Sequence, residues 1–328
     1  MTFLYIVIAL ALIFDFINGF HDSANAIATV VSTKVLSPFA AVMLAAVFNF
    51  IAFTVFPLKV ATTIGTGVVN PDVINLTVIS AALFAAITWN LMTWWWGLPS
   101  SSSHTLVGGL VGAAIASSGP GSVIVGGVFK IVIFIVIAPL LGMIISFIIS
   151  AIVLNFTKNH SPFGIDKHFR RLQLLSAAAF SLGHGGNDAQ KSMGIIWVAL
   201  ITTGFTTVND KIDLWIVLSC QAAIALGTFF GGWRIVKTMG QRITKLKPFE
   251  GFCAETAGAI TLFGATHFGI PVSTTHTITG SIIGVGARKG ASAVKWGVTT
   301  KIFWAWILTI PVSGIIGAIM YLCFNWIN

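Results

Sequence analysis

The sequence is poor in charged residues and in cysteine. Only 8% of its 328 residues are Asp, Glu, Lys or Arg, whereas soluble domains average about 25%. Hydrophobic residues make up 56% and the mean hydropathy is +0.95, which excludes an ordinary soluble protein and predicts a multi-pass protein in a lipid bilayer. Cys220, Cys253 and Cys323 stand isolated in apolar segments, so we expect neither a disulfide framework nor a zinc site.

Acidic residues are also scarce, and the net charge is +9. Proteins that bind nucleic acid cluster their basic residues where a polyanion reaches them. Here the basic residues lie in short connectors between apolar segments, so we expect no nucleic-acid partner. Placing Lys34 and the connectors 158–171, 234–247 and 288–295 on one side gathers 13 of the 18 basic residues there. This asymmetry predicts that these connectors are cytoplasmic and that both termini lie outside the cytoplasmic (inner) membrane.

Two polar loops repeat within this apolar sequence. Residues 97–105 read GLPSSSSHT and residues 269–277 read GIPVSTTHT, 172 positions later. Repeated interruptions in matching halves are typical of transporters built from inverted repeats. We therefore predict a first repeat over 1–154, a basic cytoplasmic connector over 155–171 and a second repeat over 172–328, together forming one transmembrane transport domain.

The lengths of the apolar segments predict how the loops are held. About 20 residues span a bilayer, so 104–118 and 276–287 are too short to cross alone. Each is predicted to form the second arm of a re-entrant hairpin with the Ser/Thr loop at its tip. The predicted fold is an all-α inverted repeat with two re-entrant helical hairpins, and with helices broken near 18–25 and 183–191.

A second repeated motif carries an aspartate in each half. Residues 18–25 read NGFHDSAN and residues 184–191 read HGGNDAQK. A carboxylate inside a membrane helix is costly and usually has a cationic partner; for Asp188 that partner is either an ion or Lys191, at helical i,i+3 spacing. The predicted site for a coupling sodium ion or proton comprises Asp22, Asn25, Asn187 and Asp188.

The Ser/Thr loops suit an anion. Each precedes a short glycine-rich segment, and the N-terminus of a helix offers unpaired N–H groups and a partial positive charge. We expect the loops to bind an oxyanion without a fixed cationic side chain; the alternative is ordinary helix capping by Ser and Thr. His104 and His276, directly after the loops, either contact substrate or act as structural struts. The predicted anion-binding residues are Ser101, Ser102, Ser103, Thr105, Ser273, Thr274, Thr275 and Thr277, with Gln190 as a further candidate.

These motifs resemble those of the inorganic phosphate transporter (PiT) family, in its bacterial low-affinity type. The resemblance rests on residues 19–26 and 185–189, which are similar to paired Gly-Ala-Asn-Asp signatures with departures at Phe20, His21 and Gly186, and on both Ser/Thr loops. It implies symport of inorganic phosphate with sodium or protons, in a homodimer, with phosphate between the two hairpin tips and the cations beside the two aspartates.

We therefore predict a secondary active transporter that carries phosphate together with sodium or protons. No enzymatic reaction and no cofactor are expected; Na⁺ is expected as a co-transported ion. The alternatives are a sulfate or metal-phosphate symporter of the same fold, an anion channel, and a membrane enzyme with Ser101 or Ser273 as nucleophile.

Overall fold

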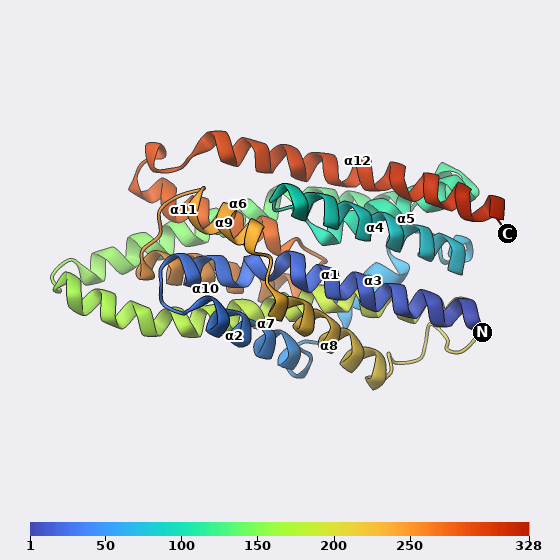
Figure 1. The fold of residues 1–328 in the computed structure, drawn as a ribbon, viewed down its shortest axis with the longest axis horizontal. Coiled ribbons are helices and arrows are strands. Elements are labelled where there is room, and N and C mark those ends of the chain that lie inside the picture. The colour runs from blue at the N-terminus through green and yellow to red at the C-terminus, as the bar shows by residue number, and fades with distance from the viewer. Residues whose placement is uncertain (328) are drawn as a thin grey trace.

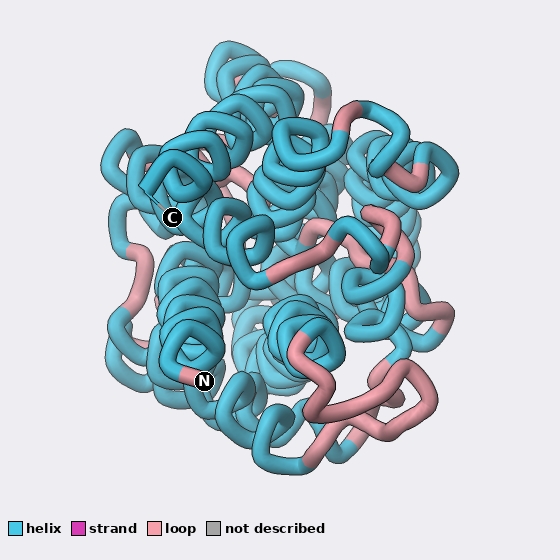
Figure 2. The backbone as a smooth tube through the Cα atoms, turned by 90° about the vertical axis from the view of Figure 1, so that its right-hand side faces the viewer, coloured by secondary structure: helices cyan, strands magenta, loops and turns pink. Residues whose placement is uncertain are grey.

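The computed structural model describes residues 1–327, apart from the side chains of Pro162 and Ile327. It is an elongated bundle of α-helices with both termini at the same end (Figure 1), and no strand forms within the described part (Figure 2). The all-α architecture is confirmed. The helices are α1 (Thr2–Ser32), α2 (Pro38–Ile51), α3 (Lys59–Thr66), α4 (Leu76–Trp96), α5 (Ser102–Ser118), α6 (Val125–Thr157), α7 (Pro162–Thr202), α8 (Leu214–Phe230), α9 (Trp233–Gln241), α10 (Pro248–His267), α11 (Thr274–Lys289) and α12 (Trp296–Ile327).

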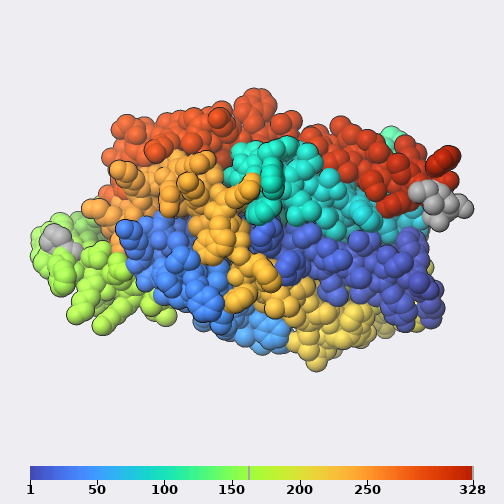
Figure 3. All heavy atoms as spheres, viewed as in Figure 1, coloured from blue at the N-terminus to red at the C-terminus, as the bar shows by residue number. Residues whose placement is uncertain are grey.

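The order of elements repeats. Helices α1, α4, α6 and α12 are long and apolar enough to cross a membrane. Two further spans result if each sharply bent pair is counted as one: the chain turns by 83° between α2 and α3, and by 71° between α8 and α9. The second six helices thus follow the first six in kind, including the bend in the second span of each half. In the surface view, helices of the second half lie across α1 of the first half (Figure 3).

Helices α1 and α7 are continuous, so the breaks predicted near 18–25 and 183–191 are wrong. The glycines there serve packing rather than unwinding. A Cβ at Gly19 would lie 2.1 Å from the carbonyl oxygen of Ile224 on α8, and one at Gly185 would lie 2.4 Å from that of Asn49 on α2. The motif glycines therefore let the bent span of the other half approach closely, while the helix keeps its own backbone hydrogen bonds.

The segment predicted to connect the halves is largely helical. Helix α6 continues to Thr157 and α7 begins at Pro162, so most of 155–171 is helical. The hydroxyl of Ser161 accepts a hydrogen bond from the Gly164 N–H at 3.2 Å, capping α7. Proline at the first position of a helix and Ser before it are both favourable there, and this local signal outweighs the polar composition of the segment.

Two helical hairpins face one another along the long axis. Helices α4 and α5 lie in the half of the molecule that carries the termini, and α10 and α11 lie in the opposite half (Figure 1). Helix α5 packs on α12, and α11 packs on α6, so each hairpin is held by the last helix of the other half of the chain. The loops between the hairpin helices, residues 97–101 and 268–273, meet in the middle, where Ser103 Oγ lies 3.5 Å from the carbonyl oxygen of Val272.

Candidate functional site

Four of the predicted hydroxyls are engaged by their own helices. Ser101 accepts a hydrogen bond from the His104 N–H at 3.3 Å, and Ser273 accepts one from the His276 N–H at 3.2 Å. Thr105 and Thr277 donate to the carbonyl oxygens of those two serines, at 2.8 and 2.9 Å. The two halves repeat this arrangement, and these four residues form the first turns of α5 and α11.

The other four hydroxyls lie where the hairpin tips meet. Ser103 contacts the ammonium of Lys191, and Ser102 Oγ is buried without a hydrogen-bond partner. Thr274 donates to Asp188 Oδ2 at 3.0 Å, and Thr275 donates to Asp22 Oδ1 at 3.4 Å. One tip is therefore bonded to the aspartates of both halves.

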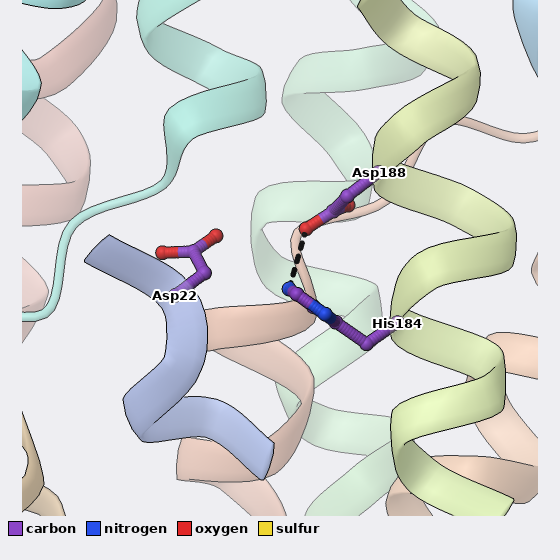
Figure 4. Close-up of side chains that lie close together, drawn as sticks. All are labelled: Asp22, His184 and Asp188. Carbon is purple, nitrogen blue, oxygen red and sulfur yellow. Dashed lines mark ion pairs between the residues drawn. The ribbon is translucent and has the colours of Figure 1, made fainter. Parts of the chain in front are cut away.

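The two aspartates approach each other from different helices. Asp22 projects from α1, whereas His184 and Asp188 project from α7 (Figure 4). Each of the three offers one ligand atom, and these atoms all lie within 4.8 Å of one another. His184 Nε2 is 3.1 Å from Asp188 Oδ2, and His21 Nδ1 is 2.6 Å from Asp22 Oδ1. The fold brings together two residues that are 166 positions apart, in a cluster able to hold a cation.

Asn25 joins this cluster to the second tip. Its Nδ2 donates to Thr274 at 3.2 Å and to Thr275 at 2.9 Å. Asn187, by contrast, donates to Thr266 Oγ1 at 2.9 Å and to the Ile270 carbonyl oxygen at 3.3 Å, while its Oδ1 has no partner. Asn187 thus fixes the end of α10, and its free oxygen remains available to a ligand.

Lys191 connects the parts of the site. Its buried ammonium contacts Asp188 and Ser103, and it donates to the Val272 carbonyl oxygen at 3.0 Å. Lys191 forms the ion pair with Asp188 that their i,i+3 spacing allows. The same ammonium also contacts both hairpin tips. The structure therefore brings a buried lysine of α7 beside the loops, for which the sequence predicts an anion site without a fixed cation; that anion site stays a prediction.

Gln190 lies apart from the tips. Its Nε2 donates to the carbonyl oxygens of Pro57 and Gly186, at 3.0 and 2.8 Å. Its Oε1 accepts from the N–H groups of Val60 and Ala61, at 2.9 and 3.2 Å. The side chain therefore holds the start of α3, just after the bend, and its part in anion binding stays a prediction.

The two histidines after the loops pack against each other behind the tips. The rings of His104 and His276 have their centroids 4.8 Å apart, and His276 stacks on Trp306 at 3.9 Å. Both histidines are fully buried. This packing favours the structural reading, in which the pair supports α5 and α11 from behind.

The chain is similar over its whole length to known transporters. The sequence model of the Phosphate transporter family matches residues 18–317. A probable low-affinity inorganic phosphate transporter of Rhizobium meliloti (strain 1021) is 56% identical over 96% of this chain and 94% of its own length. One of the same description from Bacillus subtilis (strain 168) is 46% identical over 100% and 98%. A solved structure described as the sodium-dependent phosphate transporter covers 100% of both chains with a TM-score of 0.89 at 26% identity.

These findings exclude the reading of Ser101 or Ser273 as the nucleophile of a membrane enzyme, because the relatives are transporters. Together with the apolar helices they make this a multi-pass membrane protein. The resemblance carried by the paired aspartate motifs and the Ser/Thr loops is confirmed: the chain belongs to the Phosphate transporter family, and phosphate transport is its function.

Proposed function

We propose that the protein is a secondary active symporter that moves inorganic phosphate together with sodium across the cytoplasmic membrane. One observation carries the proposal: Thr274 and Thr275, at one hairpin tip, donate hydrogen bonds directly to Asp188 and Asp22. The candidate anion site and the candidate cation site are thus joined through shared hydroxyl groups.

The shared hydroxyls supply a coupling mechanism. A Thr hydroxyl has a single O–H donor, so it serves either the carboxylate or a bound phosphate. A sodium ion that binds the carboxylates of Asp22 and Asp188 displaces the two Thr hydroxyls from them. Both hydroxyls are then free to donate to the anion. Cation and phosphate then each bind more tightly in the presence of the other, and a symporter requires this reciprocal coupling.

Charge balance supports the same conclusion. Asp22 and Asp188 carry two negative charges against the single positive charge of Lys191, and all three side chains are buried. Phosphate adds further negative charge. Because isolated charge is costly in a buried site, the loaded site requires cations from solution, and an oxygen-rich cluster suits a hard ion such as sodium.

We place the anion itself between the hairpin tips. The free hydroxyl of Ser102, the ammonium of Lys191 and the N-termini of α5 and α11 meet there. N-terminal N–H groups and hydroxyls replace part of the hydration shell of an oxyanion. The same donors suit sulfate and metal-phosphate, which remain the alternative substrates.

The best test is uptake of radiolabelled phosphate into proteoliposomes with sodium and pH gradients imposed separately. An inward sodium gradient is expected to drive accumulation above equilibrium, and unlabelled sulfate in excess is expected to leave the rate unchanged. A proton gradient acting in place of sodium would reassign the coupling ion. Mere equilibration without either gradient would favour an anion channel.

We predict that replacing Ser102 with Ala weakens phosphate binding by roughly 10- to 150-fold. The hydroxyl has no protein partner to lose, so the change removes only a donor to a charged ligand, worth about 1.5–3 kcal/mol. Equilibrium binding of phosphate in saturating sodium measures the effect.

The matched control for this variant is Ser281→Ala. That hydroxyl, on the same helix as the second tip, donates to the Thr277 carbonyl oxygen of its own helix at 2.9 Å. Its loss is expected to leave phosphate affinity within about two-fold. Equal affinities for Ser102→Ala and the parent protein would show that the anion does not contact Ser102.

The topology of the halves is part of the proposal. We assign 1–154 and 172–328 as inverted repeats, with α4–α5 and α10–α11 as re-entrant hairpins that open from opposite sides and with both termini outside. The repeated element order and the opposed hairpins support this assignment. The homodimer stays a prediction from the family resemblance.

A labelling experiment tests this topology. In a variant with Cys323, which is exposed, changed to Ser, single cysteines are introduced at Asp72 and Asn159, both exposed. We expect an impermeant maleimide added to intact cells to label position 72 and not position 159, because the basic connector lies inside. Labelling of both positions from outside would reject the inverted repeat.

A further inference from the structure

A second carboxylate group lies on α1, two turns before Asp22 and toward the end that carries the termini. Asp15 is fully buried, and neither of its carboxylate oxygens has a hydrogen-bond partner. Among the described residues, no basic side chain forms an ion pair with it. An ionised carboxylate in this state is among the most costly groups in a protein interior, so its presence needs an explanation.

The surroundings of Asp15 are also rich in unpaired oxygen. Two polar side chains lie within hydrogen-bonding reach of its carboxylate, Ser192 on α7 and Asn18, one turn further along α1. Ser192 Oγ and Asn18 Oδ1 are buried and have no partner. The same is true of Gln221 Oε1 on α8, which adjoins Cys220, whose thiol lies close enough to feel the Asp15 charge.

These side chains come from three helices that pack on one another in pairs, α1, α7 and α8. The backbone of α8 approaches α1 at Gly19, where the Ile224 carbonyl oxygen is closest. Gln221 is one turn before Ile224, and Asp15 is one turn before Gly19, on helices that run in the same direction (Figure 1). The register of the two helices therefore places Gln221 on the level of Asp15 and Asn18.

We propose that Asp15, Asn18, Ser192 and Gln221 form a second sodium site, separate from the cluster at Asp22 and Asp188. The four side chains offer five buried oxygen atoms without a protein donor. Such a set suits a hard cation, and a single carboxylate matches a monovalent ion, whereas protein sites for divalent ions usually gather several. The cation explains at once why all five atoms lack hydrogen bonds.

The position of this site gives it a place in transport. The charged groups that face Asp15 from α7 are Asp188 and Lys191, so the stretch of α7 from Asp188 to Ser192 borders both sites. A sodium ion at Asp15 lowers the net negative charge near Asp188 when phosphate arrives. Binding of sodium at Asp15 does not depend on the proposed symport; only this role in transport rests on it.

The test is binding of radiolabelled sodium to the purified full-length protein in detergent, without phosphate, with number and affinity of sites measured by titration. The Asp15→Asn variant is expected to lose one sodium site per chain relative to the parent protein, whereas Asp72→Asn, which removes an exposed carboxylate, is expected to lose none. Unchanged site number and affinity in Asp15→Asn would overturn the proposal. An unchanged sodium titration together with an altered pH dependence of phosphate uptake would also overturn the proposal, because Asp15 would then be a proton site.

Ser192→Ala keeps the proposal testable if Asp15→Asn does not fold. It removes one neutral ligand and is expected to weaken one sodium site about ten-fold, without changing the site number. A titration identical to that of the parent protein would count against the site. Phosphate uptake is measured in parallel: loss of sodium dependence there with intact sodium binding would reject the proposed symport and leave the Asp15 site standing.

Discussion

Replacing Asp22 with Asn is expected to reduce sodium-driven phosphate uptake about 100-fold while the protein still inserts and folds. The change removes the charge that a cation requires, and it replaces the carboxylate that accepts from Thr275 with a neutral amide, whose oxygen is a weaker acceptor. Loss of a charged partner costs up to about 3 kcal/mol, or roughly two decades in affinity. Uptake into proteoliposomes that contain equal amounts of each variant measures the effect.

The expected control is Asp72→Asn, whose carboxylate lies exposed in a loop and whose loss should leave uptake unchanged. An Asp22→Asn protein that transports at near-normal rates with the same sodium dependence would make Asp22 a structural residue. Its contacts with His21 and Thr275 would then be packing interactions, and the coupling ion would have to bind elsewhere.

Replacing Lys191 with Met is expected to destabilise the protein by about 3–5 kcal/mol in sodium-free buffer. The ammonium is the strongest partner of the buried Asp188, and removal of one member of a buried ion pair leaves the other charge without compensation. The change also deletes the contacts to Ser103 and Val272, so the two hairpin tips lose their common anchor. The free energy of unfolding, measured by denaturant titration in detergent, reports this loss.

The double variant Asp188→Asn with Lys191→Met separates charge from packing. Because it removes both charges, it is expected to recover a large part of the stability lost by Lys191→Met alone. Sodium is also expected to stabilise Lys191→Met more than the parent protein, because the ion replaces the missing positive charge beside Asp188. Additive effects of the two changes and no response to sodium would contradict an energetic link between the ion pair and the cation cluster.

Much of the fold and the site was predictable from repetition in the sequence. The two Ser/Thr loops, 172 residues apart, and the two aspartate motifs lie together at the middle of the structure, and each loop begins a helix. These features can be predicted from the sequence because they depend on local signals: the length of apolar runs, proline and glycine at the loops, and serine at helix N-termini.

Other features of the site depend on partners that are distant in the chain. The glycines at 19 and 185 suggested unwound helices, but their role is set by the neighbouring backbones of α8 and α2. Gln190 is a further candidate for the anion site by its sequence, and only the structure shows that its amide holds the start of α3. In each case the role of the side chain or glycine depends on the helix that packs against it. A single sequence does not specify which helix that is, because the two are distant in the chain.

The sequence alone determined the class of protein and the residue types at the candidate site, because apolar length and repeated motifs follow directly from the order of residues. Only the tertiary structure decided which groups are joined there. Lys191 reaches both tips, Thr274 and Thr275 reach the aspartates of both halves, and Asp15 of α1 lies beside Ser192 of α7. A buried charge must find its partners within a few ångströms, and those distances exist only once the helices have packed.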